Sequence, residues 1–554
     1  MPLHPASTSE ENSYHGNESS SQQQQQQQNS LVSVPSSPFR HGSSSPSSSV
    51  INDSQHLGYD NLVRVLNFHP KYLEIFLKCH LHLLSGDGPL PFTHRAYIGM
   101  MAVSRVRCSP LAQTLARDFL QLGGDPAWLE GLHRAPKKIR NLSAINKILA
   151  HRPWLVRKSH IAELTKNFEQ EQWSASELVH ALTLLTHFHA LSSFVFACGL
   201  QKDDEAAAAA AAGRGSSTPP SSPGSPFVGG SGNAVASGGS PMEASWLMDS
   251  VLERMQRRFN DPSREELTPQ ECVKRFFTVG SQTAELTGFR KQPLAQSRSS
   301  NINNASSSTT SFFGKLTRSS SSLTTTTTSP LPLLTTEESA MATTMETMTV
   351  STSPVAELFL QRFVEDPDFG YDSSLFDPKN NPSSSSSSSS SCNGPPHLHH
   401  LQDEENEHLL YVQDYSWQEH GFSVLNRFYD AEGSNLLDDK FSVAENLTYR
   451  TMASHSGVDT FVFRRAIWNY IDVLFGICHD DYDYKEIDEL LPRPLKKFIK
   501  AAICFPDKLA KKDYRDSMRE LKHSEKVHIN ILMMEARFQG EMLYALRAVT
   551  QHLV

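Results

Sequence analysis

Apolar residues recur every three or four positions along two long stretches of the sequence. In the first stretch, about 56–201, the recurrence links Tyr72, Ile75 and Phe76, and later Leu178 with Ala181 and Leu182. This spacing places the apolar side chains on one face of an α-helix. The second stretch, about 407–554, has the same period and ends in a long helix expected from about Lys522 to Leu553. Because no alternating strand of useful length is found, the sequence predicts an all-α protein.

Several helix ends are marked by residues that favour them. Ser109 and Pro110 suit an N-cap and a first helical position, and Gly123 with Gly124 is expected to stop the helix that follows. The string from Ser174 to Glu177 is a capping box, in which the serine and glutamate side chains satisfy each other's backbone amides. These signals predict helix starts at about 109 and 174.

Low-complexity tracts surround the two helical stretches. They include glutamines at 22–28, alanines at 206–212, threonines at 324–328 and serines at 383–391. Such tracts carry too little apolar surface to offset chain entropy, so residues 1–55 and most of 202–406 are predicted to be disordered. Within 202–406 we expect a helical island at 244–285 and a short segment at 353–378. The island has an apolar face that must pack on something larger: Trp246, Leu247, Val251 and Met255.

Composition excludes several classes of protein. The chain has 554 residues and a formal charge of −9, and this mild acidity argues against a dedicated nucleic-acid protein. Its seven cysteines show no paired metal or CxxC spacing, which favours a reducing cytoplasmic or nuclear setting. No run approaches the roughly 18 apolar residues of a membrane span. Removing the low-complexity tracts leaves roughly 330 residues, enough for two domains, 56–201 and 407–554.

Two histidine pairs, His80 with His82 and His187 with His189, are candidate metal ligands. A spacing of two residues on a helix turns the side chains of each pair to different faces. The sequence therefore predicts core or surface histidines, with no metal and no cofactor.

Cys108 is the cysteine whose neighbours in the sequence most favour a reactive thiol. It lies in the string Arg107-Cys108-Ser109-Pro110, beside a guanidinium and at the start of a predicted helix, and both features favour a thiolate. The alternative is a small buried apolar residue in a helix junction. The sequence alone leaves both interpretations open.

The second stretch contains an unusual pair of arginines. Arg464 and Arg465 lie in a predicted core helix within residues 446–470, NLTYRTMASHSGVDTFVFRRAIWNY. A guanidinium buried without a partner costs several kcal/mol, so at least one of them should face water or meet an anion. The acidic run that follows, 479–484, suits either a solvated loop or a protein contact.

Long segments of both stretches closely resemble the sestrins. The first stretch carries HPKYLEIFLK at 69, DGPLPFTHRAYIGMMAVSR at 87, GGDPAWLEGLHRAPKKIRNLSAINKILAHRPWL at 123 and SSFVFACGL at 192. The second carries VQDYSWQEHGFSVLNR at 412, DDYDYKEI at 480 and KHSEKVHINILMMEARFQGEMLYALRA at 522. The resemblance implies two helical halves similar to the alkylhydroperoxidase and carboxymuconolactone-decarboxylase fold. It also implies a stress-inducible inhibitor of TOR complex signalling that binds the GATOR complex and releases it on binding leucine.

The resemblance also implies roles for individual residues. Glu525 would hold the α-ammonium of a bound amino acid and Arg464 its carboxylate, while His69 would be a latch from the first half. Where leucine-sensing members carry a tryptophan wall, this chain has Met518, which predicts weaker or less selective leucine binding. The expected lid and hydrogen-bonding residues are Thr448, Tyr449, Thr451 and Thr460.

A partner surface and an enzymatic alternative follow from the same resemblance. Asp480, Asp481 and Ser174 align with residues implicated in GATOR binding. Cys108 aligns with a cysteine credited with alkyl hydroperoxide reduction, but the family's relay tyrosine and histidine are replaced here by Pro110 and Leu115. The two hypotheses are therefore an amino-acid-binding regulator and a thiol-dependent antioxidant enzyme.

Overall fold

The computed structural model describes residues 59–166, 172–200, 241–260, 267–286, 354–376 and 408–553. The low-complexity tracts predicted to be disordered lie outside these residues. All described residues belong to one compact unit within Pro46–Val554.

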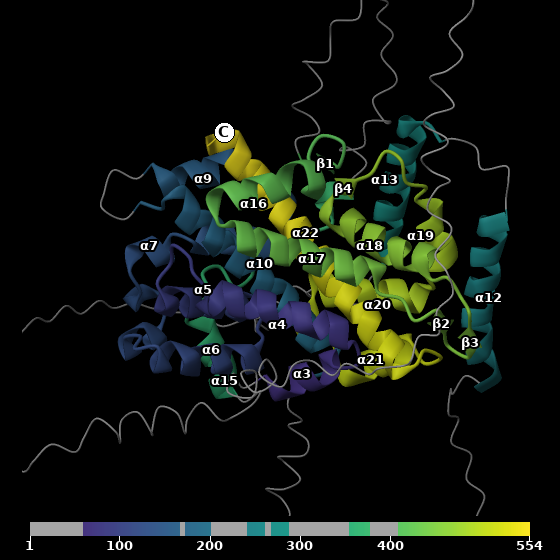
Figure 1. The fold of residues 1–554 in the computed structure, drawn as a ribbon, viewed down its shortest axis with the longest axis horizontal. Helices are drawn as coiled ribbons and strands as arrows, with labels where there is room; N and C mark the ends of the chain where they lie inside the picture. Colours follow the sequence, from purple (N-terminus) through teal and green to yellow (C-terminus); the bar gives the residue numbers. More distant parts are fainter. Residues whose placement is uncertain are drawn as a thin grey trace, which may run out of the picture. The chain divides into compact units, whose positions relative to one another are not determined.

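Helices dominate the part of the chain that the structure describes, so the all-α prediction is confirmed (Figure 1). The first stretch contains α3 Asp60–Leu66, α4 Pro70–Ser85, α5 Phe92–Arg105, α6 Ser109–Gln121, α7 Lys137–Arg140, α8 Ser143–His151, α9 Lys158–Thr165 and α10 Ala175–Ala197. The middle of the chain contributes α12 Pro241–Asn260, α13 Pro269–Glu285 and α15 Pro354–Gln361. The second stretch contains a π-helix at Trp417–Gly421, then α16 Phe422–Phe428, α17 Ala431–Asn446, α18 Phe461–Phe475, α19 Lys485–Leu490, α20 Arg493–Cys504, α21 Lys511–Ser517 and α22 His523–Leu553.

Two short β-ladders accompany the helices. Strands β1 Leu410–Tyr411 and β4 Ile477–Cys478 pair in parallel, whereas β2 Thr451–Met452 and β3 His455–Ser456 form an antiparallel hairpin. Each strand is two residues long, which is too short to produce an alternating pattern in the sequence.

Helix ends follow the predicted signals with one correction. The capping box at Ser174 is confirmed, because its Oγ accepts from the Glu177 amide and the Glu177 carboxylate accepts from the Ser174 amide. The N-cap of α6 is Cys108 rather than Ser109, since the chain already turns into the helix at the serine. This helix ends at Gln121, and Gly123 takes the left-handed φ of 81° that glycine favours.

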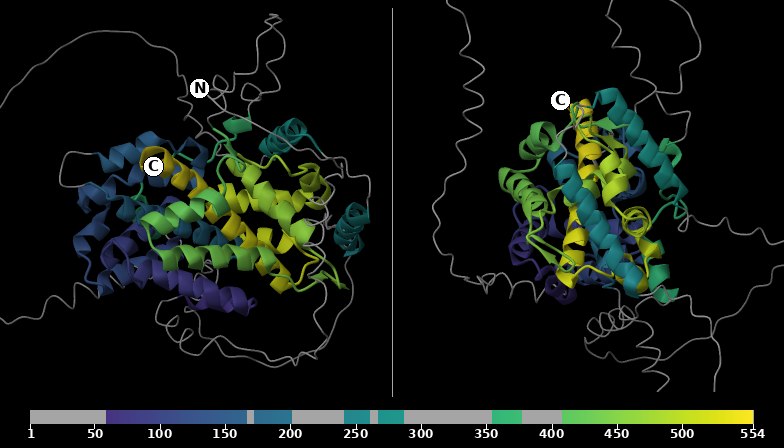
Figure 2. Two further views of the ribbon diagram at one scale, coloured as in Figure 1. Left: turned by 45° about the horizontal axis from the view of Figure 1, so that its top comes forward. Right: turned by 90° about the vertical axis from the view of Figure 1, so that its right-hand side faces the viewer.

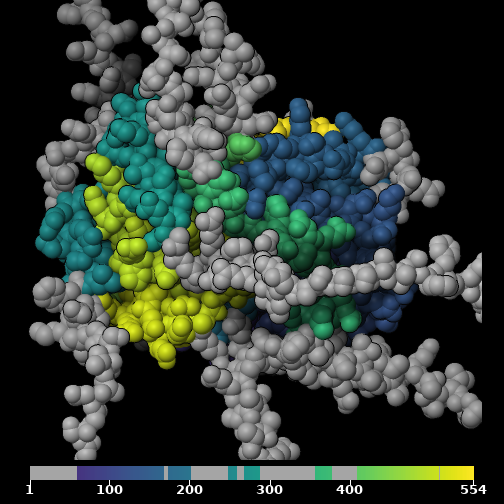
Figure 3. Space-filling model, turned by 180° about the vertical axis from the view of Figure 1, so that it is seen from behind, coloured from purple at the N-terminus to yellow at the C-terminus, as the bar shows by residue number. Residues whose placement is uncertain are grey.

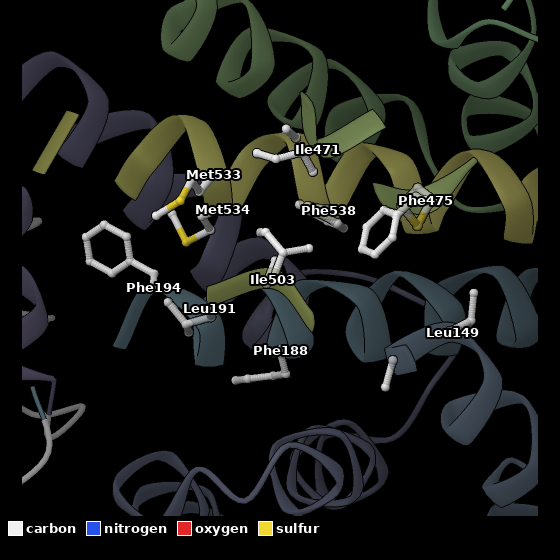
Figure 4. Close-up of a cluster of buried hydrophobic side chains, with 14 of the residues drawn as sticks. Leu149, Phe188, Leu191, Phe194, Ile471, Phe475, Ile503, Met533, Met534 and Phe538 are labelled. Atoms are coloured by element: carbon white, nitrogen blue, oxygen red, sulfur yellow. The ribbon is translucent and has the colours of Figure 1, made fainter. Parts of the chain in front are cut away.

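Helices α10 and α22 pack against each other at the centre of the molecule (Figures 1 and 2). Figure 4 shows buried side chains from both stretches in one cluster, with Ile503 of α20 between Leu191 of α10 and Phe538 of α22. The predicted halves 56–201 and 407–554 therefore contribute to one continuous hydrophobic core.

Helix α10 departs from the expectation that no run of the sequence approaches the apolar length of a membrane span. By length and composition this helix is apolar enough to cross a membrane, but its most apolar window is entirely buried within the protein. Its Thr183, Thr186 and Ser192 hydroxyls donate to carbonyls one turn earlier, which satisfies them without water. The core helix of a globular protein passes the same test of length and composition.

A buried guanidinium joins four of these helices. Arg537 of α22 donates to Glu541 at 2.8 Å, to Ser193 of α10 at 2.6 Å, and to the carbonyls of Ile503 and Ala150 at 2.8 and 2.9 Å. The Glu541 carboxylate also contacts His189 Nδ1 at 2.8 Å, and His189 Nε2 contacts the Asn146 side chain at the same distance.

The predicted helical island consists of α12 and α13. Val251 and Met255 are buried as expected, but Leu247 is exposed and Met248 is buried in its place. The apolar stripe is therefore rotated slightly from the predicted one, and it packs against α19. The side chain of Trp246 lies outside the described part of the chain.

Residues 354–376 form a strap across the molecule, visible in Figure 3 as the green surface between the blue and yellow-green regions. Near its middle, Arg105 of α5 donates to the carbonyls of Glu365 and Asp366 at 2.9 Å and of Phe369 at 2.5 Å. Further on, the Tyr371 hydroxyl donates to the Leu474 carbonyl at the end of α18. Arg152 also donates to the Gly370 carbonyl at 2.7 Å, so two cations hold the strap through its backbone.

We expect Arg105→Ala to lower the free energy of unfolding by about 2–4 kcal/mol, because three strap carbonyls lose a charged donor. Chemical denaturation of the full chain measures this change. Arg134→Ala is the control, since its exposed guanidinium pairs with Glu130 one turn earlier and such pairs contribute under about 1 kcal/mol. Equal destabilisation by the two substitutions would contradict the role assigned to Arg105.

Candidate functional site

The segment between α17 and α18, residues 447–460, folds back on itself and carries all four of the predicted lid and hydrogen-bonding residues. Arg450, Ala453 and Gly457 take positive φ angles of 51°, 55° and 75°, which allow the tight β2–β3 hairpin. The Val458 amide closes the loop by donating to the Arg450 carbonyl at 3.0 Å. We call this segment the hairpin loop.

Glu525 ties the hairpin loop to the first turn of α22. Its carboxylate accepts from the Thr451 hydroxyl at 2.9 Å, from the Ala453 amide at 3.1 Å and from the Lys522 amide at 2.9 Å. A carboxylate offers about four acceptor positions, so one remains for a further donor such as an ammonium group.

Arg464 lies in the first turn of α18 as a buried cation whose hydrogen-bond partners are neutral. Its side chain donates to the Thr460 hydroxyl and to the Glu445 carbonyl, and the residue is 7% exposed. Burial lowers the pKa of the guanidinium, although Asp459 and Glu445 oppose that effect at longer range. Among the described residues, no carboxylate lies within ion-pair distance of Arg464.

Arg465 has a different environment. Its Nη2 atom lies 2.9 Å from both carboxylate oxygens of Glu486, and its guanidinium lies over the rings of Phe461 and Tyr482. The two neighbouring arginines therefore differ: Arg465 has a carboxylate partner, as expected for at least one of the pair, whereas Arg464 is buried against neutral groups.

A cavity of about 290 Å³ opens beside Arg464. Its walls include Trp417, Trp468, Tyr482 and, toward the predicted partner surface, Asp481. Glu525 and Met518 are not among its lining residues. The two predicted clamp residues are instead linked through the hairpin loop, because the Thr451 hydroxyl donates to the Glu525 carboxylate and the Thr460 hydroxyl accepts from the Arg464 guanidinium.

His69 connects the first helical stretch to this loop. Its Nδ1 atom lies 2.8 Å from the Tyr449 hydroxyl, and its Nε2 atom lies 2.8 Å from the Ser524 carbonyl. Since a carbonyl only accepts, Nε2 carries the proton and the tyrosine donates to Nδ1. Burial lowers the pKa of His69, which favours this neutral form.

The remaining predicted pocket residues differ in exposure. Met518 is 2% exposed and follows α21, whereas the ring of Tyr449 is 51% exposed above His69. Thr448 is exposed, and its hydroxyl accepts from the Arg450 amide. Thr448 therefore shapes the loop from outside, while Met518 belongs to the interior.

His528 is a site residue that sequence analysis missed. It is buried, its ring centroid lies 5.5 Å from that of His69, and burial together with the charges of His69 and Arg464 lowers its pKa to about 3. The spacing of three residues from Glu525 on one helix was the available signal, because it places both on one face.

The predicted partner residues lie on two different elements. Asp480 is half-buried and Asp481 exposed, in the turn between β4 and α19, and the His479 amide donates to the Tyr484 hydroxyl within that turn. Ser174 is exposed at the start of α10, where the capping box holds it. Among the residues that the structure describes, no hydrogen bond or ion pair joins Ser174 to the acidic turn.

Cys108 does not meet the conditions predicted for a thiolate. The side chain is fully buried, and burial raises its pKa to about 12, despite hydrogen bonds from Leu111 and Ser192 that act in the opposite direction. Arg107 takes a φ of 61° and lies 3.6 Å from Glu357 and from Asp507, so its charge is shared with two carboxylates. Desolvation therefore outweighs the helix terminus, and the environment of Cys108 favours the second interpretation, a small buried apolar residue in a helix junction.

The paired histidines diverge as predicted. His80 contacts His187 at 2.9 Å across α4 and α10, while His82 contacts Asp430 and His189 contacts Glu541. Within the described ranges, no group of three or more histidine, cysteine or acidic residues is arranged to hold a metal ion.

Comparison with known proteins covers most of the chain. The family model described as PA26 p53-induced protein (sestrin) matches residues 21–387 and 397–553. Sestrin-2 of Homo sapiens is 39% identical over 511 residues, covering 90% of this chain and 87% of that relative. Sestrin-1 of Xenopus laevis and Sestrin-3 of Mus musculus are each 36% identical over 496 residues, covering 89% of this chain and 85% of the relative. The matched ranges include every candidate residue described above.

We expect Cys108 to resist alkylation in the native protein, because a pKa of about 12 leaves roughly a thousandfold less thiolate than an ordinary cysteine has. Mass spectrometry of iodoacetamide-treated protein, native and denatured, measures the modification of Cys108. Arg107→Ala should leave the slow native rate unchanged. Rapid native labelling that Arg107→Ala abolishes would restore the activated-thiol interpretation.

Proposed function

This chain belongs to the sestrin family, and from that premise we propose that it is a regulatory protein that binds a free amino acid, leucine in the first place. The ligand carboxylate is bound by Arg464 and the ligand ammonium by Glu525. In the unliganded state the protein binds the GATOR complex and thereby restrains TOR complex signalling.

The observation that carries this proposal is the environment of Arg464. A buried guanidinium is stable when it is paired with an anion, and its hydrogen-bond partners here, Thr460 and the Glu445 carbonyl, are neutral. A ligand carboxylate supplies the missing charge through a charge-assisted hydrogen bond. Arg465, one position later, has no such need because Glu486 already neutralises it.

Glu525 supports the other half of the proposed clamp. Its carboxylate is held in place by one hydroxyl and two backbone amides, so it is oriented before a ligand arrives. An α-amino acid carries an ammonium and a carboxylate on one carbon, and a site with one acid and one base selects that pair of charges. Because Thr451 and Thr460 belong to the hairpin loop, ligand binding also acts on the loop.

The proposed partner surface is supported by how the local carboxylates are used. Asp483, Glu486 and Glu489 are engaged in ion pairs with Arg258, Arg275 or Arg465. Asp480 and Asp481 have no ion pair within the described residues, and Asp481 is exposed. Helix α18 begins beside Arg464 and leads directly through β4 into this turn, which gives the ligand a short route to the partner surface.

We expect leucine to raise the melting temperature of the purified full chain, because a ligand that binds the native state stabilises it by about 2.7 kcal/mol at one hundred times its Kd. Arg464→Ala and Glu525→Ala should each abolish the shift, and leucinol, which lacks the carboxylate, should produce none. Differential scanning fluorimetry measures these shifts.

Arg519→Ala is the matched control for the leucine experiment. Arg519 is an exposed cation beside Met518 that pairs with Asp516, so its removal tests the loss of nearby charge without touching the clamp. The control should keep the full leucine shift. The proposal fails if millimolar leucine shifts none of the folded proteins, or shifts the two clamp variants as much as the wild type.

We expect Met518→Trp to tighten leucine binding, because a rigid indole would replace a flexible thioether at the position where leucine-sensing relatives carry tryptophan. Because Met518 is buried, the larger side chain overpacks its site, and we expect the free energy of unfolding to fall by about 1–3 kcal/mol. Isothermal titration gives the Kd, with Met518→Leu as a volume-conserving control. An unchanged Kd in a folded Met518→Trp protein would remove Met518 from the pocket wall.

A further inference from the structure

Helix α12 packs along the surface of the second helical stretch, although the sequence separates it from that stretch by about 150 residues. Figures 1 and 2 show α12 spanning from the level of α19 to the β2–β3 hairpin. Its buried face consists of Met248, Val251, Leu252 and Met255. The helix therefore bridges two regions that the proposed function uses separately.

The beginning of the described part of α12 is attached to the surroundings of the proposed amino-acid pocket. The Met248 amide donates to the Glu520 carboxylate at 2.8 Å, and Asp249 lies 2.9 Å from His455 Nε2. Glu520 lies two residues after Met518. His455 belongs to β3, and the same hairpin holds Glu525 through Thr451 and Ala453.

The end of α12 is attached to the segment that follows the acidic turn. Arg258 lies 2.6 Å from Glu489, 3.1 Å from Glu486 and 3.2 Å from Asp483. Glu486 is shared with Arg465 of α18, the neighbour of the proposed carboxylate-binding Arg464. Asp483 is shared with Arg275 of α13 at 2.7 Å. Arg258 is thus central to a network of acids and arginines beginning two residues after Asp481.

We propose that α12 is a coupling element that transmits the position of the hairpin loop to the acidic turn carrying Asp480 and Asp481. The proposal rests on the proposed function, in which a ligand acts on the hairpin loop and the partner binds the acidic turn. From Asp249 to Arg258 an α-helix rises about 14 Å, and a helix attached at both ends moves as one body. Displacing the hairpin end therefore shifts Arg258 and the carboxylates that it holds.

Hydrogen exchange of the full chain without ligand tests the coupling directly. Arg258→Ala should speed amide exchange in 480–491, where its contacts are lost, and also in the hairpin at 451–456, which Arg258 does not contact. We expect about fivefold or faster exchange at the remote end. Arg257→Ala is the control, because this exposed neighbour pairs with Glu253 on α12 itself, and it should change neither region.

The coupling can also be tested in the reverse direction, by a substitution at the hairpin end of α12. Asp249→Ala removes the contact with His455 and should speed exchange in 483–489. If Arg258→Ala does not fold, Glu489→Gln replaces it, because it weakens one contact of Arg258 at a half-exposed residue. Changes confined to the mutated end in both directions would overturn the proposal.

A leucine titration separates this proposal from the proposed function. In the wild type, leucine should alter exchange both at 451–456 and at 480–484, whereas Arg258→Ala should retain the first change and lose the second. Leucine-induced change at 480–484 that persists in Arg258→Ala would overturn the coupling. If leucine alters no exchange in the wild type, the proposed function fails, while the ligand-free comparison still decides whether α12 couples its two ends.

Discussion

The fold depends on satisfying one fully buried guanidinium. Arg537 has no access to water, so each of its donors needs an acceptor within the core. These acceptors come from α8, α10, α20 and α22 itself, and they exist together only when all four helices are packed in this register. Removing one partner of such a group leaves an uncompensated charge, so the network favours one arrangement of the two helical stretches. The apolar contacts of α10 and α22 supply the stability, and Arg537 supplies the specificity.

Local structure followed from the sequence because its causes are local. The three-to-four residue period predicted the long helices, and the Ser174–Glu177 capping box is present as expected. Helix geometry also explains why Arg464 and Arg465 have different environments, since adjacent helical residues face directions about 100° apart. In contrast, the N-cap at Cys108 and the inward rotation of Met248 depend on small shifts that helix periodicity does not fix.

Contacts between distant parts of the chain could not be predicted from local pattern. His69 contacts Tyr449 across 380 residues and Arg105 contacts Phe369 across 264 residues. The sequence next to His69 or Arg105 does not identify these partners. Cys108 shows the same limit for reactivity. Its neighbours in sequence favour a thiolate, but its pKa is set mainly by burial, which depends on elements far along the chain. The clamp residues are implied by the family resemblance, whereas the contact between the rings of His528 and His69 depends on how distant parts of the chain pack.

The way Arg105 holds the strap has a consequence for how this protein can evolve. Every amino acid brings the same carbonyl oxygen, so the hydrogen bonds of Arg105 to the carbonyls at positions 365, 366 and 369 impose no side-chain identity, although the guanidinium also lies over the Phe369 ring. Selection through this contact falls on the arginine and on the path of the strap backbone. Glu365 is therefore free to vary as far as this contact is concerned, whereas Asp366 is constrained separately by its φ of 54° and by its ion pair with Lys147 at 3.1 Å.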